Sequence, residues 1–261
     1  MKISVNRKDA IWGYVSTAFS MCINFIMLPF ILHYLTGDEV GIYYIFVSIS
    51  AIGSFFDFGF TPCFARSVSY AWSGADTIDP EGGSLSVSNE PNYNLLKKII
   101  RTCQILYFLL ASTALILSLS VGTVYVHHLI KDLEGYHSYL IAWFVYAGSI
   151  FLSLLYGYYS ALLSGVGAVR FSNKAMVIGR VIQIALCIGL LITGAGLIGV
   201  AVAYLSYGFA FRFIAKHYFD TYHGMRQKLK ESKVIVTKAD IKNMIAKIWP
   251  NTWKEGVVTL S

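Results

Sequence analysis

The sequence predicts an all-α integral membrane protein, a polytopic bundle of six transmembrane helices followed by the start of a seventh. Of its 261 residues, 56% are hydrophobic and only 13% are charged, whereas soluble domains are about 25% charged. The apolar residues gather in runs of about 20 residues or more, the length that crosses a bilayer as a helix. These runs lack the alternation of membrane β-strands. Because a chain in lipid must satisfy its own backbone hydrogen bonds, we expect the runs to be helices.

Six apolar runs are long enough to span a bilayer. They are Ala10–Leu35, Val40–Ala65, Thr102–Val126, Tyr139–Val166, Ala175–Thr193 and Leu197–Ile214. The first is too long for the apolar part of a signal peptide, so we expect it to remain as a span. A seventh run begins near Gly256, and its short length predicts a truncated chain. The sequence thus predicts a six-helix bundle at 1–215, a basic linker at 216–250 and the start of a seventh span at 251–261.

The lysines and arginines predict the orientation. With a cytoplasmic N-terminus, all but two of the 21 basic residues fall on the cytoplasmic side, the exceptions being Lys131 in an outer loop and Arg180 within a span. Cytoplasmic loops of membrane proteins carry such an excess. A basic cytoplasmic face attracts anionic lipid headgroups, so membrane lipids account for the net charge of +7 and no nucleic-acid partner is expected.

The second run contains a carboxylate, Asp57, within "FFDFGFTPCFARSVSYAWSGA". A charge at the centre of a membrane helix costs about 2.5–3.5 kcal/mol and normally faces a cavity or a partner. Arg180 lies at a similar depth in the fifth run, so the two side chains could pair. Arg66 lies at the cytoplasmic end of the second run, where long basic side chains usually reach toward the headgroups.

The fourth run carries a stripe of small side chains. In "SLLYGYYSALLSG" they recur every four positions, at Ser153, Gly157, Ala161 and Gly165. Such a stripe lets another helix approach closely and therefore predicts helix packing. The neighbouring Tyr156 and Tyr159 either stack on sugar rings or fill the interior of the bundle.

The linker contains a predicted interfacial helix in "TKADIKNMIAKIWP". Thr237 and Asp240 resemble a capping box at its start. Apolar residues then repeat at helical spacing, at Ile241, Met244, Ile245, Ile248 and Trp249. Pro250 is expected to end the helix, which should lie in the inner membrane interface.

No cofactor or metal is predicted. The four cysteines are isolated from one another, so they form neither a zinc motif nor a disulfide framework. His127, His128 and His137 fall in an outer loop, where a weak metal site is conceivable but solvated histidines are the ordinary case. "GAGLIG" fits GxGxxG but follows an apolar span instead of a strand, which argues against dinucleotide binding.

Two stretches carry a family resemblance. "LPFILHYLTGDEVGIYYIFVSI" and "DFGFTPCFARSVSYAWSGA" resemble the N-terminal half of bacterial O-antigen flippases. These proteins form the polysaccharide-transporter branch of the multidrug/oligosaccharidyl-lipid/polysaccharide exporter superfamily. The similarity extends more weakly through "PNYNLLKKIIRTCQILY" and "NTWKEGV".

The resemblance implies a function in the bacterial cytoplasmic (inner) membrane. It implies that an undecaprenyl-pyrophosphate-linked oligosaccharide is moved between leaflets by alternating access, in a cavity between two helical bundles. No bond is made or broken, so no enzyme activity is expected. A glycan polymerase and other polysaccharide-assembly proteins are the implied partners. The alternatives are a multidrug exporter of the same superfamily, or an inactive or partial half-transporter or scaffold.

In this context Asp57 and Arg180 are expected to face the transport cavity. Arg180 would attract the pyrophosphate, and Asp57 would hold Arg180 when no substrate is bound or take part in cation coupling. The alternative is a permanent ion pair that only fixes helix packing. Arg66, Tyr156 and Tyr159 are further candidates for substrate binding.

Overall fold

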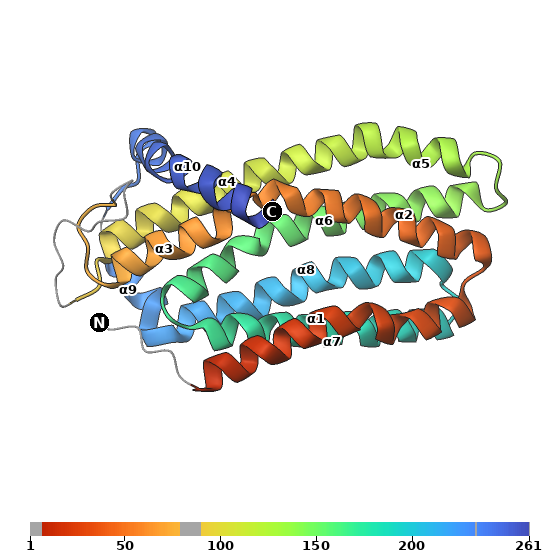
Figure 1. Ribbon diagram of the computed structural model, residues 1–261, viewed down its shortest axis with the longest axis horizontal. Helices are drawn as coiled ribbons and strands as arrows, with labels where there is room; N and C mark the ends of the chain where they lie inside the picture. Colours follow the sequence, from red (N-terminus) through yellow and green to blue (C-terminus); the bar gives the residue numbers. More distant parts are fainter. Residues whose placement is uncertain (1–6, 79–89, 233, 261) are drawn as a thin grey trace.

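The computed structural model describes residues 7–78, 90–232 and 234–260, and every regular element in these ranges is a helix (Figure 1). The longer helices are α1 (Arg7–Tyr34), α2 (Gly37–Ser54), α3 (Phe60–Trp72), α4 (Tyr93–Leu117), α5 (Thr123–Ile130), α6 (Tyr136–Gly165), α7 (Val169–Ile192), α8 (Gly196–Thr221), α9 (Met225–Glu231) and α10 (Lys238–Leu260). The short turns η1 (Phe55–Asp57), η2 (Ser118–Gly122) and η3 (Tyr222–Gly224) join some of them.

Six helical stretches are long and apolar enough to cross a membrane. They are Asp9–Tyr34, Gly37–Trp72, Tyr93–Ile130, Tyr136–Gly165, Val169–Ile192 and Gly196–Glu231. Each overlaps one of the six predicted runs, which indicates an all-α, multi-pass membrane protein. The cytoplasmic position of the N-terminus and the identity of the membrane remain predictions.

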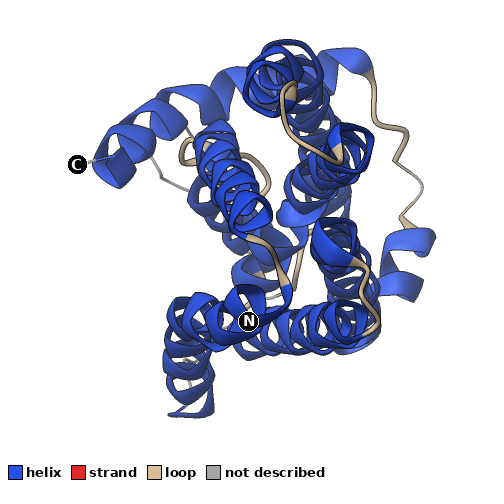
Figure 2. Cartoon of the chain, turned by 90° about the vertical axis from the view of Figure 1, so that its right-hand side faces the viewer, coloured by secondary structure: helices blue, strands red, loops and turns tan. Residues whose placement is uncertain are grey.

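The helices run side by side, as the end-on view shows (Figure 2), and α6 and α8 pack against most of the others. α6 packs along α8, α8 along α7, and α1 covers α7 on one side, while α3 and α4 pack on α6 from the other. Two apolar cores form along this axis. On α6 the last buried residue of one core is Ile150 and the first buried residue of the other is Tyr158. The partly buried Leu154 and Tyr156 pack against the first and second core respectively, so the two cores adjoin near the middle of the bundle.

The second span is broken, in contrast to the continuous helix that its apolar run predicts. α2 ends at Ser54, the 3₁₀ turn η1 follows, and α3 begins only at Phe60. Between them Phe58 and Gly59 adopt positive φ angles of 23° and 78°. Pro62 falls in the first turn of α3, where its missing N–H has no intrahelical role.

Helix α10 explains why a glycine is needed at the break. A Cβ atom on Gly59 would lie 2.6 Å from the backbone nitrogen of Gly256 and 2.9 Å from the carbonyl oxygen of Thr252. A Cβ atom on Gly256 would in turn lie 2.5 Å from the ring of Phe58. α10 therefore crosses the broken span at backbone contact distance, and in Figure 1 it runs obliquely over α3 and α4.

The prediction that Pro250 ends the linker helix is wrong, because α10 continues through it to Leu260. Contacts beyond the proline hold this extension: Thr252 is buried and donates to the carbonyl of Ile248 (3.2 Å), and Glu255 forms an ion pair with Arg66. The predicted capping box is confirmed. Thr237 donates from Oγ1 to Asp240 Oδ2 (2.7 Å) and accepts from the Asp240 backbone N–H (3.2 Å).

The third span is also interrupted, by a single wider turn. Residues 118–122 form the π-helical turn η2 between α4 and α5. A Cβ atom on Gly122 would lie 2.7 Å from the Trp143 ring of α6, and Trp143 Nε1 donates to Thr123 Oγ1 (3.0 Å). Because Gly122 has no side chain, the wider turn can pack closely against α6.

Candidate functional site

A polar cavity of about 370 Å³ lies in the middle of the bundle, at the break in the second span. Its polar lining consists of Asp57, Arg180, Tyr107, Tyr146, Tyr204, Tyr207, Ser50, Ser149, Ser153 and Thr61, and its other walls are Gly53, Gly157, Ile150 and Leu154. These residues come from α2, η1, α3, α4, α6, α7 and α8. The cavity thus collects hydroxyls and two charged groups between two apolar cores.

Asp57 enters this cavity because α2 stops just before it. Tyr107 donates its hydroxyl to Asp57 Oδ1 (2.6 Å), and Thr61 donates its hydroxyl to Asp57 Oδ2 (2.7 Å). Each carboxylate oxygen therefore has a hydrogen-bond donor, and no basic residue within the described ranges forms an ion pair with Asp57. Hydrogen bonds of this kind offset the cost of placing a carboxylate in a bundle.

The hydroxyl oxygens of Thr61 and Tyr107 also lie 2.8 Å apart, which closes a triangle with Asp57. The two hydroxyls supply two hydrogens, and an ionised carboxylate accepts both. The three side chains thus connect η1, α3 and α4 at the wall of the cavity.

Arg180 reaches the cavity from α7. Its Nη1 donates to Gln183 Oε1 (2.9 Å), and its guanidinium carbon lies 4.0 Å from the ring centroid of Tyr207. A guanidinium over an aromatic face is attracted by the electrons of the ring, which offsets part of the cost of placing the charge in an apolar setting. It carries five N–H donors, more than the contact with Gln183 uses, so this side chain is suited to binding an anion.

Gln183 is a buried polar group next to Arg180. The residue is 0% exposed, and its Nε2 has no hydrogen-bond partner. An unsatisfied buried donor costs about 1–3 kcal/mol. Gln183 Nε2 is therefore a buried donor that packing within the described residues does not satisfy.

The expected contact between Asp57 and Arg180 is absent. Both line the cavity, but among the described residues they do not form an ion pair. Asp57 instead accepts hydrogen bonds from the hydroxyls of Thr61 and Tyr107. Arg180 stacks on Tyr207. A permanent ion pair that fixes helix packing is therefore not seen, and the two charges stand apart in one cavity.

The other predicted site residues lie outside the cavity lining. Arg66 pairs with Glu255 of α10, where the sequence had suggested a side chain reaching to the headgroups. Tyr156 lies under the guanidinium of Arg212, whose carbon is 4.8 Å from the ring centroid. Tyr159 is buried and stacks on Tyr158, with centroids 4.4 Å apart.

The stripe on α6 divides into two parts. Ser153 and Gly157 line the cavity. Ala161 is buried, and a Cβ atom on Gly165 would lie 2.5 Å from the Cβ of Val68 on α3. The predicted close packing therefore occupies the end of the stripe that lies against α3.

Four tyrosines of the cavity were not singled out from the sequence. Tyr146 donates to Ser50 Oγ (3.4 Å), and Tyr204 shares a hydrogen bond with Tyr43 (2.9 Å), so these hydroxyls connect α2 to α6 and α8. A polar face on the fourth run, Tyr146, Ser149, Ser153 and Gly157, could have indicated them. The signal is weak because the same positions also fit a packing stripe.

Comparison with family models, curated proteins and solved structures gives no match. In the part of the chain that the structure describes, no group of three or more histidines, cysteines, aspartates or glutamates is placed to hold a metal ion. The prediction that the three histidines lie in a loop is wrong, because His127 and His128 lie in α5 and His137 lies in α6. His127 shares a hydrogen bond with Tyr136 (2.8 Å).

Proposed function

We propose that the chain is a transporter unit that moves an undecaprenyl-pyrophosphate-linked oligosaccharide between the leaflets of the cytoplasmic membrane by alternating access. The observation that carries the proposal is the polar cavity, where a carboxylate and a guanidinium stand unpaired with each other inside an apolar bundle. Ionisable groups within membrane spans usually mark substrate or ion pathways. The identity of the substrate as a lipid-linked oligosaccharide is inferred from the sequence resemblance.

The size of the cavity limits what it holds. A volume of 370 Å³ corresponds to about twelve water molecules at about 30 Å³ each. This space suits a small cation and a phosphate group but not an oligosaccharide chain. In the proposed mechanism the sugars occupy a larger space between this bundle and a second one, and no bond in the substrate is made or broken.

Each charged residue then has a separate role. Arg180, placed over the ring of Tyr207, binds the anionic phosphate. Asp57, held by hydrogen bonds from Thr61 and Tyr107, takes part in cation coupling. A cation bound beside Asp57 offsets the negative charge that repels the phosphate, so binding of the cation and binding of the phosphate at Arg180 are coupled.

The test uses cells whose surface glycan depends on this protein. We expect Asp57→Asn, Arg180→Gln and Tyr107→Phe to reduce surface glycan while membrane abundance stays normal. Loss of a hydrogen bond to a charged group, about 1.5–3 kcal/mol, corresponds to a reduction of about tenfold or more. Asp132→Asn, in the exposed outer turn, is the matched control and should leave the glycan unchanged. Normal glycan in all three cavity variants would refute the proposal.

A multidrug exporter is the second candidate, because the four tyrosine rings and Asp57 could bind an aromatic cation. Arg180 in the same small cavity opposes a cationic ligand. Export of a cationic dye from cells that express the chain, and its loss in Asp57→Asn, would favour this candidate over the flippase.

A further inference from the structure

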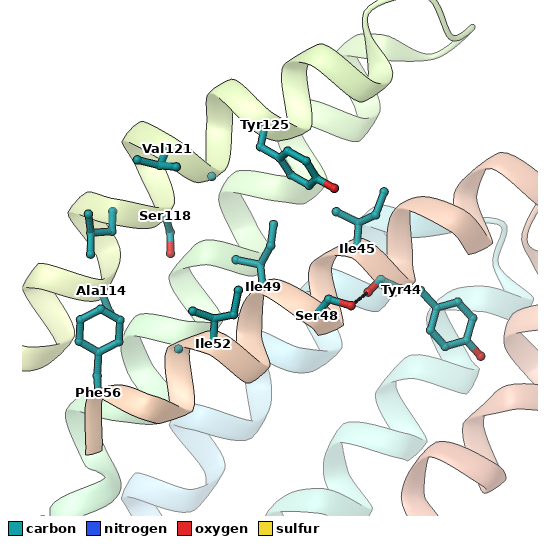
Figure 3. Close-up of a pocket in the computed structure, with 13 residues that line it drawn as sticks. Tyr44, Ile45, Ser48, Ile49, Ile52, Phe56, Ala114, Ser118, Val121 and Tyr125 are labelled. Atoms are coloured by element: carbon teal, nitrogen blue, oxygen red, sulfur yellow. Dashed lines mark hydrogen bonds between the residues drawn. The ribbon is translucent and has the colours of Figure 1, made fainter. Parts of the chain in front are cut away.

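An apolar groove runs between α2 and the α4–η2–α5 span (Figure 3). Its volume is about 650 Å³. It is lined by Tyr44, Ile45, Ser48, Ile49, Ile52, Gly53, Phe56, Ala114, Leu117, Ser118, Val121, Gly122 and Tyr125. Figure 3 shows that the isoleucines of α2 face Val121 and Tyr125 across the opening. We call this the apolar groove.

The small residues of the groove are already used in packing. A Cβ atom on Gly53 would lie 3.1 Å from Ile150, and one on Gly122 would lie 2.7 Å from Trp143, both on α6. The rim is formed by large exposed side chains: Ile52 is 62% exposed and Val121 is 67% exposed. Membrane helices associate through small residues that let backbones approach, so a rim of this kind is unsuited to a second helix.

The groove offers hydrocarbon surface and few free polar groups. Ser48, near its middle, donates its hydroxyl back to the carbonyl of Tyr44 (2.8 Å), as the dashed line in Figure 3 marks. At about 30 Å³ for a water-sized group, the volume of 650 Å³ holds a single chain of about twenty methylene-sized groups. A helix about 10 Å across is wider than such a chain.

The groove adjoins the polar cavity. Gly53 lines both spaces. The break in the second span separates their chemistry within two residues, because Phe56 lines the groove and the next residue, Asp57, lines the cavity. An apolar groove beside a polar cavity containing an arginine matches an amphiphile with a phosphate head and a hydrocarbon chain.

We infer that the apolar groove receives the hydrocarbon chain of the proposed lipid-linked substrate while its phosphate enters the polar cavity. This inference rests on the proposed function. Lipid chains and the groove are equally apolar, so burial alone gives little preference for one chain over another. The preference comes from the head group, because a phosphate held at Arg180 keeps its own chain beside the groove and raises the effective concentration of that chain there.

The test is photolabelling of the full chain in phospholipid vesicles with a polyprenyl phosphate that carries a diazirine in its chain. Mass spectrometry should locate adducts in residues 44–56 and 114–125. Ser48→Trp fills the groove from α2 and Val121→Trp fills it from the other wall. Each should reduce labelling by about tenfold, the factor that corresponds to about 1.4 kcal/mol of lost binding.

Ser120→Trp is the matched control. Ser120 is also an exposed helical serine whose hydroxyl is bonded back along its helix, to the carbonyl of Ile116 (2.7 Å), but it does not line the groove. Unlabelled polyprenyl phosphate should compete for labelling and phosphatidylglycerol should not. Equal competition by phosphatidylglycerol would identify an ordinary lipid-facing surface and overturn the inference. Cross-links from the groove to a second copy of the chain would overturn it in favour of helix docking.

A translocation assay on the same vesicles separates the two proposals. If the wild-type chain moves the lipid and both groove-filling variants move it at the same rate, the inference fails and the proposed function stands. If the wild-type chain moves no lipid in cells or vesicles, the proposed function fails whatever the labelling shows.

Discussion

The second and third spans are both interrupted, but only the interruption of the second span ends a helix. There α2 stops, two residues adopt positive φ and α3 starts anew. In the third span the chain passes through η2 with helical backbone angles at both ends, since Leu117 and Thr123 have φ of −66° and −67°. The first interruption places a carboxylate in a polar cavity, and the second forms one wall of an apolar groove.

The difference follows from the backbone. Ending a helix inside a membrane leaves N–H and C=O groups without intrahelical partners, which is tolerated only where protein or polar groups surround them. A π-helical turn keeps its hydrogen bonds within the helix, so it can face hydrocarbon. The complete break therefore lies at the polar cavity, and the widened turn lies at the apolar groove.

The largest expected loss of folding stability is that of Gly59→Ala at the complete break. The left-handed backbone costs a residue with a side chain about 1–2 kcal/mol, and the clash with α10 adds about 1–3 kcal/mol of overpacking. Unfolding of the purified protein in detergent should show the combined loss. Gly224→Ala is the control, since Gly224 has a φ of 68° but a Cβ atom added there would meet no other atom within 4 Å. Equal losses in the two variants would mean that α10 does not press on the break.

A smaller effect is expected for Gly122→Ala at the widened turn. The new methyl group would meet the Trp143 ring at 2.7 Å, and a side chain can move where a backbone cannot, so we expect a loss of about 1–3 kcal/mol. Trp143→Phe in the same chain should recover part of it. Gly189→Ala, with open space around the glycine, should cost nothing. A loss as large as that of Gly59→Ala would remove the distinction between the two interruptions.

The smallest expected loss of stability follows from removing the ion pair that connects α10 to α4. Lys98 Nζ donates to Asp240 Oδ1 (2.7 Å), and this bond, together with the Thr237 backbone N–H, holds the pKa of Asp240 well below its usual value. A carboxyl group with a lowered pKa contributes stability above its unfolded pKa of about 3.9. The contribution is lost as the pH falls from there toward the lowered value.

Hydrogen exchange of the α10 amides tests this pH dependence. Asp240→Asn should speed exchange slightly at pH 7, because exposed ion pairs contribute little, and the difference from wild type should shrink below about pH 4. Asp132→Asn serves as the control. A difference that grows as the pH falls would contradict the assignment.

The sequence predicted the spans and the unusual carboxylate well, because both depend on local composition. The six apolar runs reappear as membrane-length helices, and Asp57 lies in the cavity that its cost in lipid suggested. The break itself had a readable signal, since Gly59 followed by Pro62 is typical of one helix ending and another beginning. The length and strong hydrophobicity of the run concealed it.

Long-range contacts account for what the sequence could not predict. Proline normally ends a helix, yet α10 continues through Pro250. Beyond the proline, Gly256 packs against Gly59, which lies nearly two hundred residues earlier in the chain, and Glu255 pairs with Arg66. The guanidinium of Arg180 packs on the ring of Tyr207 and does not pair with the carboxylate of Asp57. Such pairings depend on how helices are arranged around α6, and no periodicity within one run encodes them.

The hydrogen bond between Tyr107 and Asp57 also has a consequence for how the protein is made. The donor lies 50 residues after the acceptor, and at about 5–20 residues per second the ribosome needs about 2.5–10 s to add it. Until Tyr107 has been added, Thr61 is the one of these two hydroxyl donors that is present for Asp57. The hydrogen bonds of Asp57 are therefore completed only after synthesis has reached the third span.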